Sequence, residues 1–428
     1  MSLSSLFQKV FLGASLMLVV AACSTDSSSD NQATTNNTTT PLTAGTWRGV
    51  LSAQGQEIPF LFDVATDGGK PTVTLLNGEE RLKLDEISTA GDSTTIRLGV
   101  FDAALVMRAD GNGKLKGAWV KYDGKEPYRV PFVATKGEQK VFPVAVNQKP
   151  ASFDGTWSVT FKGDDGETYP AVGVFKQTGN DITGTFLTST GDYRYLAGQV
   201  SDNTMKLSTF DGSHGFLFTA NRLSDTNTTI NGDFYSGKSG HETWTGRLDA
   251  NAKLPDANAL TGMKPNQKRL DFKFPSIYEG GSISPTDPKY KGKVVVVQIL
   301  GSWCPNCMDE TNFLAPWYEK NKQRGVEIIG LGYERTPDQK LASQKLLKMK
   351  QRLNVGYDLA VAGMANKDSA SASLPQLAKV LAFPTTIFLD KKGEVRKIHT
   401  GFSGPGTGKY YQQETDEFEK TVAGLLAE

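Results

Sequence analysis

The chain has 428 residues, a length typical of roughly two to four domains. Its 47 lysine and arginine residues nearly balance its 46 aspartate and glutamate residues. This balance gives no electrostatic reason for nucleic-acid binding, and we expect no such partner. The three histidines are scattered along the chain, so the sequence predicts no metal site and no other cofactor.

The N-terminal segment has the features of a signal peptide that ends at a cysteine. Lys9 precedes an apolar run of about 13 residues, which is too short to span a bilayer as a helix. The run ends in "VAAC" at residues 20–23, which resembles a bacterial lipobox. The resemblance implies a signal peptide over residues 1–22 and a lipid on Cys23. The alternative is an uncleaved anchor that ends in a core-like cysteine.

A polar segment follows the cysteine. Residues 24–40 are rich in Ser, Thr, Asn and Asp and cannot bury a core, so residues 23–40 are predicted to be a lipidated cysteine with a flexible tether. Several acyl chains hold a protein at a membrane far more firmly than one chain does. We therefore expect a cell-envelope protein anchored to the inner or outer membrane, facing the periplasm or the cell surface.

Residues 41–250 show the pattern of antiparallel β-structure. Alternating segments such as "IPFLFDV" and "TTIRLGV" are separated by glycine-rich turns every 8 to 12 residues. "AGTWRGVL" at 44–51 matches "DGTWSVTF" at 154–161, which indicates an internal repeat. We expect two consecutive modules, residues 41–137 and 150–250. Each has about eight strands in a barrel or sandwich, with Trp47 and Trp157 at matching places.

The function of these modules is open at this stage. A barrel interior can hold a small ligand, but its aromatic side chains can equally fill the core. A supporting, spacing or protein-docking role is the simpler interpretation. No nucleophile motif, metal spacing or telling carboxylate pair occurs in this region.

After a linker over residues 251–266, residues 267–428 have the pattern of an α/β domain. Strands alternating with helices are typical of βαβ units, and a continuous apolar strand is typical of one buried on both faces. The expected elements, in order, are a buried strand in "KGKVVVVQILGSW", a helix from Pro305, a strand in "GVEIIGLGYER", a helix in "DQKLASQKLLKMKQRL", a strand in "VGYDLAVAG", a helix in "LPQLAKVLA", a hairpin from "TTIFLD" to "EVRKIHTG", and a terminal helix from Gln413.

Cys304 and Cys307 lie in "GSWCPNC", between the first buried strand and the first helix. Free N–H groups and the helix dipole favour a thiolate at a helix N-terminus, and the thiolate is the attacking species. Cys307 is one turn further on, close enough to resolve a mixed disulfide. If Cys23 carries lipid, these two cysteines have only each other as partners within the chain. A four-cysteine zinc or iron–sulfur site is excluded by number.

This strand–CxxC–helix pattern, with a distant Phe383-Pro384-Thr385, resembles the thioredoxin superfamily. The TlpA/ResA-like branch, found in lipoproteins of Bacteroidetes-type bacteria, is the most similar. The resemblance covers about residues 270–428. Three features support this branch: the lead-in "YKGKVVVV", the insertion before Phe-Pro-Thr, and Glu310.

The resemblance implies a role for each residue of the motif. Cys304 is expected to be the nucleophile and Cys307 the resolving thiol. Pro384 is expected to be a cis-proline facing the disulfide. The backbone of Phe383 is then free to pair with an extended substrate, and Thr385 is expected to be part of the same substrate-binding surface.

Three further residues lie next to the cysteines in the sequence, and each has an expected role or environment. Glu310 lies three residues after Cys307 on the same helical face, and the family carries a carboxylate there that tunes the thiols or relays protons. Burial beside a thiol would raise its pKa, whereas the alternative is a solvated surface glutamate. Asp309 is expected to be solvated. Trp303 is expected to be a packing platform beside the thiols and part of the substrate-binding surface.

The sequence departs from the family in two places. Asn312 stands where the family usually has a proline, and Pro316 follows four residues later, which predicts a kink or break there. The strand ends "QILGSWC" instead of the more usual "FWAxWC".

The resulting prediction is a membrane-anchored thiol–disulfide oxidoreductase outside the cytoplasm that reduces protein disulfides and receives electrons from a membrane partner. Three alternatives remain. A peroxiredoxin-type peroxidase would need a threonine where Gly301 stands. A binding lipoprotein would use the β modules, with a supporting C-terminal domain. A zinc half-site would need two chains.

Overall fold

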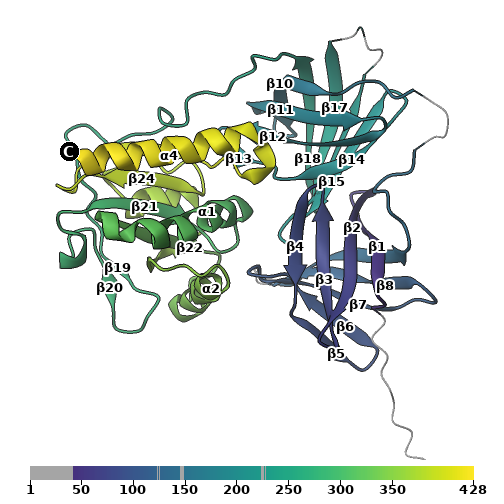
Figure 1. Ribbon diagram of the computed structural model, residues 1–428, viewed down its shortest axis with the longest axis horizontal. Coiled ribbons are helices and arrows are strands. Elements are labelled where there is room, and N and C mark those ends of the chain that lie inside the picture. The colour runs from purple at the N-terminus through teal and green to yellow at the C-terminus, as the bar shows by residue number, and fades with distance from the viewer. Residues whose placement is uncertain (1–41, 123, 125, 145–148, 223–225, 227) are drawn as a thin grey trace, which may run out of the picture. The chain divides into compact units, whose positions relative to one another are not determined.

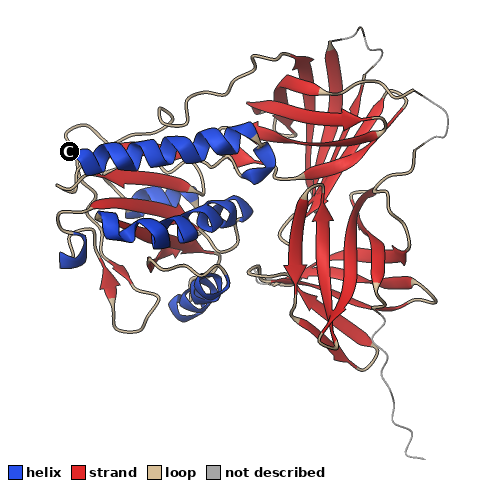
Figure 2. Ribbon diagram, in the orientation of Figure 1, coloured by secondary structure: helices blue, strands red, loops and turns tan. Residues whose placement is uncertain are grey.

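The computed structural model describes residues 42–122, 124, 126–144, 149–222, 226 and 228–428. The expected signal peptide, the lipidated Cys23 and the tether lie outside the described residues. Among the described residues, no helix is long and apolar enough to cross a membrane. Strands make up the N-terminal part of the described chain, and the α-helices belong to the C-terminal part (Figure 2).

The first sheet has nine strands in the order β4-β3-β2-β1-β9-β8-β7-β6-β5, and neighbouring strands are antiparallel. Large aromatic residues such as Phe60 and Phe132 fill its core, with ring centroids 5.9 Å apart. The strands are β1 (Gly45–Ala53), β2 (Gln56–Asp67), β3 (Lys70–Asn77), β4 (Glu80–Leu84), β5 (Ile87–Ala90), β6 (Ser93–Arg97), β7 (Ala103–Ala109), β8 (Lys114–Lys121) and β9 (Tyr128–Lys136).

The second sheet also has nine strands, and the additional pairing of β11 with β12 closes it into a barrel (Figure 1). Aromatic rings pack against one another in its interior, among them Phe161, Phe186 and Phe218. This packing favours a filled core over a ligand cavity. The strands are β10 (Gly155–Gly163), β11 (Thr168–Thr178), β12 (Asp181–Thr188), β13 (Gly191–Asp192), β14 (Leu196–Ser201), β15 (Thr204–Phe210), β16 (Gly215–Asn221), β17 (Thr229–Ser236) and β18 (Gly240–Leu248).

The first strands of the two sheets place a tryptophan in the same local setting. Trp47 in β1 and Trp157 in β10 are both buried. The indole N–H of Trp47 donates to the carbonyl of Thr43 at 2.9 Å, and that of Trp157 donates to the carbonyl of Phe153 at 2.9 Å. Each donor therefore reaches an acceptor four residues back, which satisfies a polar group that burial would otherwise leave unpaired.

The C-terminal part is built on a five-stranded sheet in the order β23-β22-β21-β24-β25. β21 is parallel to β22 and antiparallel to β24. A two-stranded hairpin, β19 (Phe274–Pro275) with β20 (Ser282–Ile283), precedes this sheet. The sheet strands are β21 (Val294–Leu300), β22 (Val326–Glu334), β23 (Asp358–Met364), β24 (Thr385–Leu389) and β25 (Val395–Thr400).

Two apolar layers cover this sheet, because alternate residues of β21 enter different clusters. Val294 and Val296 pack with side chains of α1, α2 and α4, whereas Val295 and Val297 pack with α3 and the segment before the sheet. Every residue of β21 is buried, as its apolar run predicts. The helices are α1 (Pro305–Asn321), α2 (Gln339–Arg352), α3 (Lys367–Ser373) and α4 (Lys409–Ala427), with short 3₁₀ helices at Pro288–Tyr290, Lys322–Arg324 and Pro405–Thr407.

The prediction of a helix over residues 374–382 is wrong. α3 lies just before it, at Lys367–Ser373, and residues 374–382 are irregular. Pro375 disfavours the helical conformation at the residue before it. Leu377 instead forms an isolated antiparallel bridge with Met263. Leu374, Leu377, Val380 and Ala382 are buried although the segment forms no helix.

Two helix boundaries also differ from the expectation. α4 begins at Lys409, four residues before Gln413. α1 continues past Pro316 to Asn321, so no helix break occurs at this proline. The cost of Pro316 is one lost N–H donor, which leaves the carbonyl of Asn312 without its helical partner.

Candidate active site

The turn between β21 and α1 fixes the position of Cys304. Its backbone N–H donates to the carbonyl of Gly301 at 3.1 Å, and its own carbonyl accepts the first helical bond from Met308 at 3.1 Å. Cys304 is the N-cap of α1 and Pro305 occupies the first turn. Proline is suited to this place because the N–H that it lacks would have no helical partner.

The two sulfurs differ in environment. The Cys304 Sγ accepts a hydrogen bond from the backbone N–H of Cys307 at 3.3 Å and lies 3.4 Å from the carbonyl oxygen of Phe383. Cys304 is 6% exposed, whereas Cys307 is fully buried at 0%, and both are free thiols. Burial, and then the neighbouring Cys304, raise the pKa of the Cys307 thiol well above its ordinary value. Cys307 therefore keeps its proton while both thiols are free.

Pro384 follows directly after a residue that borders the Cys304 sulfur. The Phe383–Pro384 peptide bond is cis. The carbonyl of Phe383 faces the Cys304 sulfur, so the backbone before the proline borders the reactive thiol.

Trp303 is held as a platform beside the dithiol. Its indole N–H donates to the carbonyl of Tyr333 at 2.8 Å, and its ring meets that of Phe383 edge-on at 5.6 Å. The guanidinium of Arg335 lies over the indole at 4.3 Å. A Cβ at Gly301 would lie 2.2 Å from the indole nitrogen, so only glycine fits there. The unusual glycine in "QILGSWC" is thus explained by the position of the indole.

The expectation for Thr385 needs a correction. Its side chain is fully buried, and its hydroxyl donates to the carbonyl of Ala382 at 2.9 Å. It cannot contact a bound substrate in this conformation, because the first residue of β24 points into the domain. It serves instead to hold the turn that carries Pro384.

Glu310 is buried among neutral hydrogen-bond donors. Its carboxyl accepts hydrogen bonds from the amide of Gln298 at 2.7 Å and from the hydroxyl of Thr386. Tyr357 donates to the other end of the Gln298 amide at 3.0 Å. Burial raises the pKa of Glu310 to about 7, and these two hydrogen bonds limit the rise. The carboxyl can therefore exchange a proton near neutral pH, and the alternative of a solvated glutamate is wrong.

Asp309 is also buried, at 7% exposed, so its expected solvation is wrong. Its carboxylate pairs with the guanidinium of Arg194 at 3.0 Å. Arg194 lies between β13 and β14, donates to the carbonyl of Pro305 at 3.0 Å and also pairs with Glu80. Burial raises the pKa of Asp309 to about 7 even though Arg194 lowers it, because several carboxylates share one cation. A residue of the second β-sheet thus contacts the turn that contains the cysteines.

A family model described as Redoxin matches residues 253–413. This region contains both cysteines, Glu310 and the cis-proline. The C-terminal part of the chain is a thioredoxin-superfamily domain of the TlpA/ResA-like type.

Relatives of this thioredoxin-like domain bear names from thiol–disulfide chemistry. The thiol–disulfide oxidoreductase ResA of Bacillus thuringiensis subsp. konkukian is 31% identical over 117 residues, which are 27% of this chain and 59% of the relative. The thiol:disulfide interchange protein DsbE of Escherichia coli K12 is 26% identical over 162 residues, which are 37% of this chain and 77% of the relative. The chain thus spans 59% of the length of the ResA protein that it matches.

Solved structures give weaker likenesses. A putative DsbE from Chlorobium tepidum is 20% identical with a TM-score of 0.27, and the match covers 36% of this chain and 96% of that one. A secreted thiol-disulfide isomerase from Corynebacterium glutamicum is 18% identical with a TM-score of 0.30, covering 40% and 99%.

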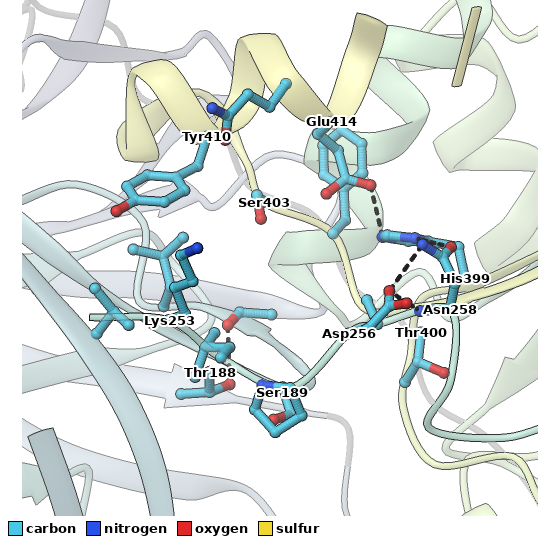
Figure 3. Close-up of a pocket in the computed structure, with 18 of the residues that line it drawn as sticks. Thr188, Ser189, Lys253, Asp256, Asn258, His399, Thr400, Ser403, Tyr410 and Glu414 are labelled. Atoms are coloured by element: carbon cyan, nitrogen blue, oxygen red, sulfur yellow. Dashed lines mark hydrogen bonds and ion pairs between the residues drawn. The ribbon is translucent and has the colours of Figure 1, made fainter. Parts of the chain in front are cut away.

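An open pocket of about 480 Å³ borders the thioredoxin-like domain (Figure 3). Its walls come from the end of β12, residues 250–258, the end of β25 and the first turns of α4. His399 and Glu414 line it, and their side chains are joined at 2.7 Å between Nε2 and Oε1. Neither residue belongs to a motif that the sequence shows.

Sequence reasoning missed the residues that surround the motif. Gln298 offered a signal, since it is the single polar residue in the apolar run "VVVVQIL". Arg194, His399 and Glu414 offered none, because their spacing from the cysteines follows no local periodicity. Only the fold brings Arg194 to Pro305, across 111 positions of sequence.

Proposed function

We propose that this protein is an extracytoplasmic thiol–disulfide oxidoreductase that reduces protein disulfides. The observation that carries the proposal is the asymmetric dithiol: a helix-capping Cys304 beside the cis-proline, and a fully buried Cys307 one turn behind it. The Redoxin match and the names of the relatives support the same chemistry.

The proposed reaction begins when the Cys304 thiolate attacks one sulfur of a substrate disulfide. The other substrate sulfur leaves with the electron pair of the broken bond and takes a proton from solvent. Cys307 then loses its proton and attacks the Cys304 sulfur of the mixed disulfide. The second substrate thiolate leaves, so the substrate gains two electrons and two protons and the enzyme gains one disulfide.

Glu310 is the proposed base for the second step. It lies three residues after Cys307 on α1, and its negative charge is among the factors that raise the pKa of that thiol. A carboxyl with a pKa of about 7 can take the proton and give it back at neutral pH. Trp303 and the backbone of Phe383 form the proposed docking surface for an extended substrate.

The cellular setting is part of the proposal. The lipobox-like "VAAC" supports lipidation at Cys23, with residues 24–40 as a tether to the inner or outer membrane. Continued reduction of substrates requires an electron donor, which we propose to be a membrane partner. The names ResA and DsbE of the relatives are compatible with this cell-envelope location.

We also propose that residues 41–137 and 150–250 are two copies of one β module, joined by a linker over residues 251–266 to the thioredoxin-like domain. The matching "GTW" strands and the equivalent bonds of Trp47 and Trp157 support this duplication. The packed aromatic interior of the second barrel supports a structural or docking role over capture of a small ligand.

The experiment that tests the function uses two single variants and a disulfide-bonded protein substrate. Cys307→Ser should trap a mixed disulfide at Cys304, because the resolving thiol is missing. Cys304→Ser should form no adduct and lose all turnover. An adduct on Cys307, or equal activity in both variants, would overturn the assignment. Rapid consumption of hydrogen peroxide would favour a peroxidase instead.

A further inference from the structure

Beside Glu310 lies a second group of titratable side chains that the proposed chemistry does not use. A small cavity of about 20 Å³ lies between them. Its lining includes the polar side chains of Glu310, Thr386, His399 and Glu414, together with apolar side chains of α1, β24 and α4. A cavity of this size has room for about one water molecule, and polar groups border it.

His399 is held at both ring nitrogens. Its Nδ1 lies 2.9 Å from the amide oxygen of Asn258, and its Nε2 lies 2.7 Å from Glu414. The Asn258 amide nitrogen donates to Asp256 and Glu417, which fixes the direction of its oxygen. Nδ1 must therefore donate to Asn258, and Nε2 faces the carboxylate (Figure 3).

The environment of this pair favours a charged imidazole. Burial by itself would lower the pKa of His399, but the hydrogen bond and the charge of Glu414, with the charges of Glu310 and Glu417, outweigh burial and raise it. Both side chains of the pair are 14% exposed. The pair is thus largely shielded yet still in reach of water.

The same pair lines the open pocket of about 480 Å³. His399 and Glu414 therefore border both the small cavity next to Glu310 and the larger pocket that opens to solvent. Cys307 has no exposed surface, and Glu310 is only 3% exposed, so a proton leaving them needs such a connection.

We propose that His399 and Glu414 form the relay through which the proton that Glu310 takes from Cys307 reaches solvent. The proposal rests on the oxidoreductase function above. Neither residue touches the reacting sulfurs, so both act through Glu310.

The transfer balances without any further reactant. When the Cys307 sulfur bonds to the Cys304 sulfur, its proton passes to Glu310 and the electron pair of the broken bond leaves on the substrate sulfur. A water in the small cavity passes the proton from Glu310 to the Glu414 carboxylate, which the His399 imidazolium holds in place. Glu414 then releases the proton to water in the open pocket, and reduction of the enzyme disulfide runs the relay backwards.

The remaining charged residues on this cavity provide a matched control. Lys397 and Glu417 also line it, and they pair with each other. Glu417 lies one helical turn beyond Glu414 on α4 and borders the same pocket, but it makes no hydrogen bond with His399 in the described contacts. Glu417→Gln therefore removes one carboxylate charge of the same helix face, and its amide oxygen can still accept the hydrogen bond from Asn258.

The test measures resolution of the mixed disulfide in a single turnover. Full-length reduced protein is mixed with hydroxyethyl disulfide at pH 6 to 9, and the reaction is quenched in acid. Mass spectrometry then measures the amount of the Cys304 adduct. Glu414→Gln and His399→Ala should slow the loss of the Cys304 adduct about 10-fold, less than the loss of about 100-fold or more expected for a group that itself exchanges a proton with the reacting sulfur. Glu417→Gln should stay within about twofold of the unchanged protein.

Chemical rescue separates a relay from a merely structural role. Imidazole entering the open pocket should restore the rate of His399→Ala in proportion to its concentration, and it should not affect the unchanged protein. Thermal unfolding shows whether each variant is folded. His399→Gln keeps a polar side chain but carries no positive charge, so it should resolve the adduct as slowly as His399→Ala.

The outcomes separate the relay from the function. If the unchanged protein forms no adduct at Cys304, the oxidoreductase function fails and the relay fails with it. If the unchanged protein turns over, but Glu414→Gln, His399→Ala and Glu417→Gln all resolve the adduct as fast as the unchanged protein does, the relay alone is overturned. Slow resolution that imidazole does not restore also overturns it.

Discussion

Asp309 and Glu310 are neighbours on α1, and burial raises the pKa of both to about 7, but they face different regions. Asp309 faces Arg194 of the second β-sheet, with Glu80, Asp192 and Asp211 close by. Glu310 faces the neutral amide of Gln298 and the hydroxyl of Thr386. Loss of a proton at Asp309 alters an ionic cluster, whereas Glu310 can exchange one without breaking an ion pair. The difference supports the role that we propose for Glu310 beside Cys307.

The largest expected effect on stability comes from removing the cation on the Asp309 side. Arg194→Met should cost about 3–5 kcal/mol of unfolding free energy at pH 8, because it leaves buried carboxylates without a partner. The loss should shrink at pH 5, where those carboxyls can be protonated. Urea denaturation at the two pH values measures this.

Arg194→Lys is the matched control, since it keeps one charge and loses the paired donors to Glu80 and Pro305. It should be less destabilising than Arg194→Met. Equal stability of Arg194→Met and the unchanged protein at pH 8 would contradict the ionic role of this cluster.

The second effect concerns the neutral environment of Glu310. The pKa of Glu310 in the folded protein, about 7, lies above its ordinary value of 4.5. The stability that the protonated carboxyl contributes is therefore fully present below pH 4.5 and is lost as the pH rises through 7. Glu310→Gln resembles the protonated form at every pH. It should match the unchanged protein near pH 4 and be more stable at pH 8 by about 3 kcal/mol, at about 1.4 kcal/mol per pKa unit.

Urea denaturation from pH 4 to 8 measures this, with attention to the slope of stability against pH. A Glu310→Gln variant that is equally destabilised at both ends of the range would show that the carboxyl is ionised at all these pH values. That result would remove the basis for proton exchange at Glu310.

A smaller effect is expected at Thr386, whose hydroxyl lowers the pKa of Glu310. Thr386→Val should raise that pKa further and move the pH dependence of adduct resolution to higher pH. It should also cost about 1.5–3 kcal/mol at pH 8, as expected for a hydrogen bond to a charged group, and less at pH 5. Thr386→Ser keeps the hydroxyl, so its pH profile should coincide with that of the unchanged protein.

The core of the candidate site could be predicted because local rules determine it. A buried strand followed by Cys-Pro places Cys304 at a helix N-terminus, and a three-residue step places Glu310 on the face of Cys307. The irregular segment at 374–382 could not be predicted from its apolar spacing, since buried irregular chain shows the same spacing. There Pro375 and the bridge from Leu377 to Met263 overrode the helical pattern.

The surroundings of the site depend on tertiary contacts that no local rule reveals. No local feature of the sequence distinguishes Asp309 from a solvated carboxylate on a helix surface. Only the fold brings Arg194 into contact with it. The same holds for His399 and Glu414, which come from β25 and α4 and meet beside Glu310.

The most direct test of the account is the reduction potential of the Cys304–Cys307 pair, measured on the full-length protein equilibrated in thiol redox buffers. A reversible two-electron couple at roughly −250 mV or lower is the result we predict for a reductant supplied by a membrane donor. A value near −120 mV would reverse the direction and indicate a disulfide donor. A pair that cannot be cycled at all would contradict the oxidoreductase function itself.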